Sequence, residues 1–285
     1  MAIIKLISHI YINYKAIMQL RSEKSGIKAY IFITCLVDTF FPAVGENMVR
    51  VLNRIGVETE FLEEQTCCGQ PAFNSGYQQD AKAVAERFLT VFDKALNDSS
   101  GKDIYIVCPS GSCTSMVKVF YKELFHNDLQ LLNITTRVSA QAYEFTDFLV
   151  NVLNTSDVGA EYDGVITYHD SCHMLRELGI NDAPRELIRS IKGAQFTEME
   201  MHDACCGFGG TFSVKFPDVS VSMLDEKIDC ITKSGADTVV SADMGCLMNI
   251  GGALSRRNIP VKVMHIADLL AQGGEGGSQG GSQGT

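Results

Sequence analysis

The sequence predicts an α/β protein made of two pseudo-symmetric repeats, each a mainly parallel sheet flanked by helices. Three observations lead to this prediction. Short strand-like runs alternate with longer helix-like segments, which is typical of parallel α/β units. The same order of elements occurs twice between residues 28 and 271. Cysteines occupy matching places in both halves, at a period far longer than that of a solenoid, so a whole domain has been duplicated.

The chain divides into five predicted segments. They are an N-terminal extension (1–27), a first Cys-Cys-Gly repeat (28–138), a connector with a helix (139–163), a second Cys-Cys-Gly repeat (164–271) and a tail (272–285). The tail consists mostly of Gly, Ser and Gln, a composition that predicts a flexible segment.

Each repeat begins with an apolar strand-like run and continues with helix-like and strand-like segments in turn. In the first repeat we expect strands over 28–34, 57–62 and 104–108, helices over 43–55 and 77–97, and a helix opening at Gly111. In the second we expect strands over 164–169, 195–200, 237–242 and 260–265, helices over 183–191, 218–234 and 266–271, and a helix opening at Gly245. In the connector we expect a helix over 141–153.

The cysteine spacing supports the duplication. Cys35 precedes Cys67 by 32 positions, and Cys172 precedes Cys205 by 33. Each half then has an adjacent pair followed by Gly (Cys67-Cys68-Gly69 and Cys205-Cys206-Gly207) and one further cysteine (Cys113 and Cys246). Cys68 precedes Cys113 by 45 positions, whereas Cys206 precedes Cys246 by 40. A loop insertion in the first repeat explains this difference.

All of these cysteines follow predicted strands. Functional groups of parallel sheets gather beyond the carboxyl ends of the strands, so three loops can bring four thiolates together in each half. Gly69 and Gly207 permit the tight turn that two adjacent cysteines need to face one site. Cys113 and Cys246 lie at predicted helix N-termini, where the helix dipole favours thiolate over thiol.

Four thiolates suit either an iron–sulfur cluster or zinc, and a redox disulfide is a further alternative. Structural zinc usually takes two short-spaced cysteine pairs, which this chain lacks. The spacing also differs from the bacterial ferredoxin run of cysteines. We therefore interpret the pattern as a thiolate metal site, with iron–sulfur preferred.

Composition limits the kinds of binding partner and the cellular compartment that we expect for this protein. The net charge is −10 and the pI is about 5.1, which argues against nucleic acid and anionic membranes as main partners. Residues 1–20 are apolar but interrupted by Lys5, His9 and Lys15, so we expect neither a transmembrane segment nor a signal peptide. Ten cysteines without a secretory signal indicate a cytoplasmic protein whose cysteines are metal ligands or redox groups.

Five stretches carry a resemblance to a known family: 67–77 (CCGQPAFNSGY), 109–113 (PSGSC), 168–173 (YHDSCH), 205–218 (CCGFGGTFSVKFPD) and 261–270 (VKVMHIADLL). The chain resembles the lactate-utilisation protein A family of twin cysteine-rich (CCG) proteins, over about residues 28–271. This family is related to the B subunit of heterodisulfide reductase and to the anchor subunit of anaerobic glycerol-3-phosphate dehydrogenase.

The resemblance implies a bacterial iron–sulfur subunit of a complex that oxidises L-lactate to pyruvate. It implies one cluster per repeat, of the 4Fe–4S type, and other iron–sulfur subunits as partners. Two departures from the wider family matter. The heterodisulfide reductase motif ends in C-x-x-C, whereas each repeat here offers one cysteine at that place, with Cys108 as a candidate extra ligand in the first repeat. No ferredoxin-type motif is present, so a partner would supply that part of the electron path.

Polar residues near Cys172 are candidate catalytic residues. His169 and His173 could orient a cluster sulfur, bind a substrate carboxylate or act as base for a hydroxyl proton. Arg176, one helical turn beyond His173, could pair with a carboxylate. Each also has an ordinary structural interpretation: capping or support for the histidines, and a solvated surface position for the arginine. Cys108 and Cys230 are expected in the core.

Two other functions stay open. An electron carrier or scaffold would hold clusters without a substrate site of its own. A zinc-stabilised structural protein would hold one zinc in each half and lose its fold to chelators.

Overall fold

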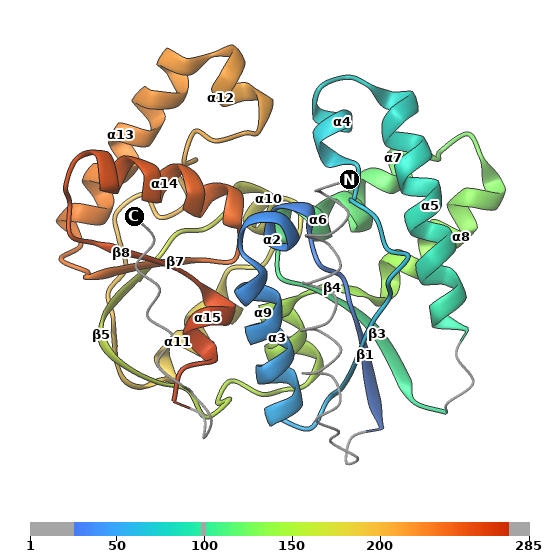
Figure 1. Cartoon of the computed structure of the whole chain (residues 1–285), viewed down its shortest axis with the longest axis horizontal. Helices are drawn as coiled ribbons and strands as arrows, with labels where there is room; N and C mark the ends of the chain where they lie inside the picture. The colour runs from blue at the N-terminus through green and yellow to red at the C-terminus, as the bar shows by residue number, and fades with distance from the viewer. Residues whose placement is uncertain (1–25, 98–100, 274–285) are drawn as a thin grey trace, which may run out of the picture.

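The computed structural model describes residues 26–97 and 101–273. It contains two four-stranded sheets, each with all neighbouring strands parallel (Figure 1). The strand orders are β2-β1-β3-β4 and β6-β5-β7-β8, so the same topology occurs twice. This confirms the predicted α/β fold with two pseudo-symmetric repeats. Most of the predicted segments 1–27 and 272–285 lies outside the described residues.

The first half runs from β1 to η2. Its elements are β1 (Ile27–Ile31), α2 (Cys35–Phe40), α3 (Pro42–Arg54), β2 (Glu58–Phe61), α4 (Gln70–Asn74), α5 (Gln78–Leu96), β3 (Asp103–Cys108), α6 (Gly111–Ser115), the π-helical turn η1 (Met116–Phe120), α7 (Tyr121–Leu124), α8 (Leu129–Gln141), β4 (Ala142–Glu144), α9 (Phe145–Asp147) and the π-helical turn η2 (Phe148–Val152).

The second half runs from β5 to α15. Its elements are β5 (Glu161–Tyr168), α10 (Cys172–Arg176), α11 (Asp182–Arg189), β6 (Lys192–Phe196), α12 (Thr211–Lys215), α13 (Pro217–Lys233), β7 (Thr238–Ser241), α14 (Met244–Arg256), β8 (Lys262–His265) and α15 (Ile266–Leu270). Within the described residues, no helix combines the length and the apolar character needed to cross a bilayer.

The two sheets share one core. Helices α3 and α15 pack against each other, as do α11 and η2. Figure 1 shows α3, α11 and α15 between the two sheets. The shared cluster includes Leu52 of α3, Phe148 of η2 and Leu269 of α15, all fully buried. Burying each such side chain contributes about 1.5–3 kcal/mol. The Arg54 guanidinium adds hydrogen bonds to carbonyl oxygens of Val158, Leu270 and Ala271, which ties α3 to the second half.

The structure corrects two predicted elements. The helix predicted over 141–153 begins instead as β4, which pairs with β3, and only then turns helical at Phe145. An apolar face of helical period within this segment concealed the short strand, because three residues are too few to show an alternating pattern. The strand predicted over 195–200 is β6 at Lys192–Phe196, and the residues after it form a loop toward the second Cys-Cys-Gly turn.

Candidate metal centres

The carboxyl ends of both sheets point toward a common cavity of about 250 Å³, here called the cysteine cavity. Seven of the eight predicted ligand cysteines line it: Cys35, Cys68, Cys113, Cys172, Cys205, Cys206 and Cys246. Cys67 does not line it but lies directly beside Cys35. The duplication therefore brings cysteines of both repeats to one cavity.

In the first repeat the sulfurs lie in close pairs. The Sγ atoms of Cys67 and Cys35 are 3.8 Å apart, and those of Cys68 and Cys113 are 3.4 Å apart. A disulfide needs about 2.05 Å between sulfurs, and all ten cysteines are free. Four unbonded sulfurs at this spacing form a donor set for a soft metal.

The Cys-Cys-Gly turns depend on glycine at both copies. Gly69 and Gly207 adopt φ values of +82° and +80°, a left-handed conformation that glycine adopts without steric cost. The turns also press against the helices that follow. A Cβ atom at Gly207 would lie 2.4 Å from the carbonyl oxygen of Ser220, and one at Gly69 would lie 3.2 Å from that of Ala81. Glycine therefore lets each turn lie directly on its helix.

Neighbouring thiols make one cysteine of each set acidic. Hydrogen bonding with Cys35 and Cys68 lowers the pKa of Cys67 to about 3. In the second repeat, hydrogen bonds from Cys172 and Cys206 lower the pKa of Cys205 to about 2. Backbone hydrogen bonds also lower these pKa values. The N–H of Gly69 donates to the sulfur of Cys67, and the N–H of Gly207 donates to the sulfur of Cys205, each at 3.4 Å. Metals bind the thiolate form, so a lowered pKa at one cysteine of each set favours metal binding there.

His169 is fully buried at the end of β5. One of its ring nitrogens and the sulfurs of Cys206 and Cys246 lie within 4.8 Å of one another. Neither ring nitrogen has a hydrogen-bond partner among the described residues. Burial, together with the nearby Lys227 charge, lowers the pKa of His169 to about 3, so the ring is neutral. A neutral imidazole beside thiolates fits the donor set of a metal centre.

The other two candidate catalytic residues occupy different places. His173 lines the cysteine cavity, with Nδ1 3.5 Å from the sulfur of Cys172. Arg176 lies on the exposed surface, where its guanidinium is 3.5 Å from the carbonyl oxygen of Asp203. Arg176 does not line the cavity. Cys108 and Cys230 are buried in the cores of the first and second repeats, respectively, away from the cavity lining.

Asp243 is a cavity residue that the sequence analysis did not single out. It precedes α14, yet its carboxylate accepts a hydrogen bond from the backbone N–H of Ser112, at 2.8 Å, in the first repeat. Ser110 holds the matching position in the first repeat, three residues before Cys113, and its hydroxyl accepts from the Cys113 N–H. Asp243 and Ser110 each lie three residues before the last cysteine of their repeat. This matching position is the sequence signal that could have identified them.

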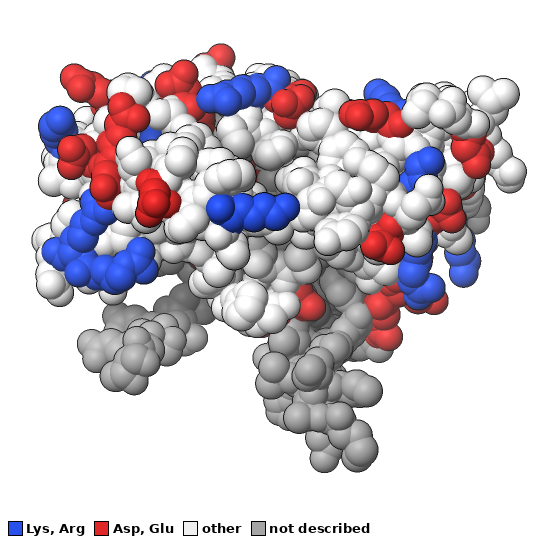
Figure 2. Space-filling model, turned by 90° about the horizontal axis from the view of Figure 1, so that it is seen from above, with Lys and Arg blue, Asp and Glu red and all other residues white. Residues whose placement is uncertain are grey.

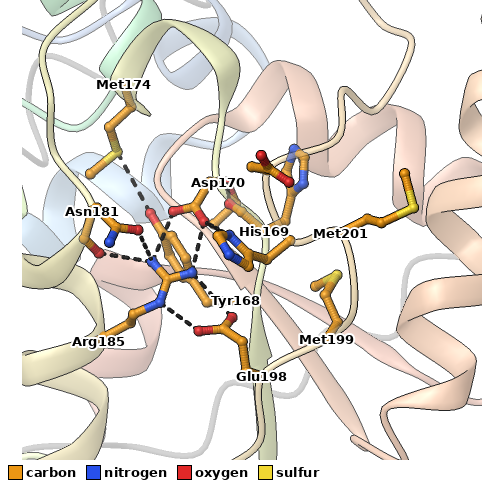
Figure 3. Close-up of polar contacts among 12 residues, drawn as sticks. Tyr168, His169, Asp170, Met174, Asn181, Arg185, Glu198, Met199 and Met201 are labelled. Atoms are coloured by element: carbon orange, nitrogen blue, oxygen red, sulfur yellow. Dashed lines mark hydrogen bonds and ion pairs between the residues drawn. The ribbon is translucent and has the colours of Figure 1, made fainter. Parts of the chain in front are cut away.

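A buried ion-pair network fixes the loop between β5 and Cys172. Arg185 donates to both carboxylate oxygens of Asp170, at 3.0 and 2.7 Å, and its Nε donates to Glu198 at 2.7 Å (Figure 3). His202 approaches the same Asp170 carboxylate at 2.6 Å. Because the buried charges of Arg185 and Asp170 satisfy each other, the network holds the short segment from His169 to Cys172 in one geometry.

Comparison with known proteins matches this architecture. The cysteine-rich domain family designated CCG matches the chain twice, over residues 29–118 and 166–251. Lactate utilization protein A of Bacillus licheniformis is 48% identical over 244 residues, covering 86% of this chain and 99% of the relative. Lactate utilization protein A 2 of Bacillus cereus is 47% identical over 247 residues, covering 87% and 99%. Lactate utilization protein A 1 of Bacillus anthracis is 46% identical with the same coverage.

Each CCG match covers most of the strands of one sheet and all four cysteines of one repeat, and the relatives align along nearly their whole length. The cysteine-rich domains themselves suggest a metal or iron–sulfur group, in agreement with the donor sets described above. The chain therefore belongs to the lactate utilization protein A family of twin CCG cysteine-rich proteins.

Proposed function

We propose that this chain is an iron–sulfur redox subunit of a system that oxidises L-lactate to pyruvate, with one cluster of the 4Fe–4S type in each repeat. The observation that carries the proposal is that seven of the eight cysteines line one cavity and the eighth, Cys67, lies beside Cys35. In the first repeat Cys35, Cys67, Cys68 and Cys113 would hold a cluster. In the second repeat Cys172, Cys205, Cys206 and Cys246 would do so. When bound, each cluster supplies a site that accepts and releases one electron at a time.

The chain's own residues set the surroundings of these clusters. The backbone N–H groups of Gly69 and Gly207 donate to sulfurs, which stabilises negative charge at the sites. Phe208, Met244 and the glycines 209 and 210 line the cavity around the cysteines. The imidazole of His173 faces the same space and is the candidate to hold a substrate proton.

The absence of cationic side chains from the described lining of the cysteine cavity favours a second candidate function, an electron-transfer or scaffold subunit. No Lys or Arg occurs among the described residues that line the cysteine cavity, whereas a 2-hydroxy acid carries a carboxylate that arginine commonly binds. Arg176 would have to leave its contact with Asp203 to reach the space. The alternative is therefore an electron-transfer or scaffold subunit, with lactate oxidised on another subunit.

The surface around the cavity suits contact with such a subunit. Helices α4 and α12 both contribute to the cavity lining, and the hydroxyls of Ser75 and Thr211 approach to 3.5 Å between them. Exposed apolar side chains follow these helices, with Tyr77 64% and Phe216 56% exposed. Figure 2 shows a face whose middle is mostly uncharged, while acidic side chains gather mainly toward its two ends. Partners of the proposed complex are other iron–sulfur subunits.

Metal and sulfide analysis of protein purified without oxygen, with EPR of the reduced protein, tests the proposal. Iron with matching sulfide is expected, and Cys206→Ser should lose about half of it. Zinc with no sulfide would instead support a zinc-stabilised structural protein. Reconstitution with partner subunits separates the two redox functions: His173→Gln should abolish lactate oxidation with clusters retained if the substrate lies in this cavity. Unchanged turnover would favour the electron-transfer subunit.

A further inference from the structure

The two repeats can be compared residue by residue around the cysteines. Cys35 and Cys172 open the first helix of each repeat, so Phe32 and His169 hold the same position, three residues earlier. Gly69 packs on Ala81 and Gly207 packs on Ser220. Seven residues farther along these helices, Phe88 of α5 therefore matches Lys227 of α13.

In the first repeat this pair of positions is aromatic. The rings of Phe32 and Phe88 are both buried, with centroids 4.8 Å apart at an angle of 72°. Phe92 completes the cluster, with its ring 5.9 Å from that of Phe32. These three rings therefore offer neither charge nor hydrogen bonds to the first cysteine set.

In the second repeat the same two positions are polar and fully buried. The Lys227 ammonium donates to the carbonyl oxygens of Met201 and His202, at 2.6 and 3.2 Å. Across residues 26–97 and 101–273 it forms no salt bridge with a carboxylate. A positive charge without a paired anion is costly to bury. Burial lowers the pKa of Lys227, and the carboxylates of Asp170 and Asp203 attract its charge without forming a salt bridge. A further negatively charged group nearby in the working protein would stabilise this charge.

His169 is a second buried polar side chain, one whose ring nitrogens lack partners among the described residues, and it lies near the cysteines. Buried polar atoms almost always have a partner, yet neither nitrogen of this ring has one in the described part of the chain. The nearest donor atoms grouped with it are the sulfurs of Cys206 and Cys246. A metal group bound by those sulfurs would supply the missing partner, and neutral imidazole is the form that ligates metals.

We propose that a ring nitrogen of His169 takes the place of one of the four cysteine ligands assigned above to the metal group of the second repeat, so that this site is a cysteine–histidine site while the first is cysteine-only. The inference rests on the proposed function, because it requires a metal group in the second cysteine set. Neutral imidazole ligation raises the reduction potential of iron–sulfur centres relative to thiolate alone. The second group is therefore the more easily reduced of the two, and electrons entering the protein collect there.

The test uses anaerobic protein containing 15N-labelled histidine and pulsed EPR of the reduced state. Cys68→Ser removes a ligand of the first repeat, so the remaining signal comes from the second. We expect a strong histidine-nitrogen coupling in this background, lost in His169→Phe, which installs the residue found at position 32. His173→Phe should retain the coupling and serves as the control, because His173 lies beside Cys172. The Cys206→Ser protein should show no such coupling.

The outcomes distinguish this inference from the proposed function. Protein without iron in either repeat would refute both. Iron–sulfur signals from the second repeat without strong histidine coupling would refute the His169 assignment and leave the proposed function intact. Unsubstituted labelled protein gives the same answer if a variant does not fold, since a reduced spectrum lacking any strong histidine coupling also refutes the assignment.

Discussion

The Asp243 carboxylate of the second repeat accepts a hydrogen bond, at 2.8 Å, from the backbone N–H of Ser112 in the first. Ser112 lies in the first turn of α6, next to Cys113, while Asp243 directly precedes α14, the helix that carries Cys246. One buried side chain thus connects the two helices that carry the last cysteine of each set. His265 adds a second connection, with Nε2 3.1 Å from the carbonyl oxygen of Pro109.

We expect Asp243→Ala to weaken both cysteine sets together. The substitution leaves the Ser112 N–H without its partner, which costs about 1–3 kcal/mol of stability. Urea unfolding measures this loss, and metal analysis should show reduced iron in both repeats. Asp243→Asn retains an acceptor oxygen and should lose less. Asp229→Ala, an exposed carboxylate on α13, is the matched control; an equal effect there would contradict the role of Asp243.

Gly207→Ala should be more destabilising than an ordinary glycine substitution at positive φ. The left-handed conformation alone costs of order 1 kcal/mol for a non-glycine residue. At Gly207 the new methyl group would also lie 2.4 Å from a helix carbonyl oxygen. Gly179→Ala separates the two contributions, because φ is +69° there but nothing lies within 4 Å of the added carbon. Equal losses of unfolding free energy for the two variants would show that the close approach has no energetic effect.

Glu144 should make stability fall as pH rises. Burial raises the pKa of this carboxyl from 4.5 to about 8, against the opposing hydrogen bonds from Thr146 and Asp147. The unfolded chain therefore loses this proton at lower pH than the folded protein. The stabilising contribution is full below about pH 4.5 and disappears as pH approaches 8. Glu144→Gln keeps an acceptor oxygen for the helix cap and should flatten this slope in urea midpoints measured across the interval; an unchanged slope would refute the assignment.

Lys227→Met should lower the reduction potential of the second repeat only. A buried ammonium stabilises the more negative, reduced state of a nearby cluster. Redox titration followed by EPR should therefore show one midpoint moving down while the other stays in place. Lys233→Met, on the exposed side of the same helix, should move neither. Parallel shifts of both midpoints would point to a general loss of structure instead.

Local sequence patterns predicted much of the fold. The apolar runs that became β1, β3, β5 and β7 and the long helices α5 and α13 were placed close to their observed ends. The helix predicted over 141–153 was wrong at its start, because β4 has only three residues and is defined by its pairing with β3 rather than by its own sequence pattern. Short edge strands of this kind depend on the neighbour that supplies their hydrogen bonds.

The sequence by itself determined the chemistry offered by each repeat, because the order of strands, Cys-Cys-Gly turns and helix starts is encoded in residues close together in the chain. Only the tertiary structure decided that both cysteine sets face one cavity. The same holds for the carboxylate of Asp243, which reaches the first repeat, and for His169, which lies with Cys206 and Cys246 in front of a buried Lys227. These relationships join residues far apart in the chain. Their physical cause is the packing of two sheets around a shared core, which no local pattern records.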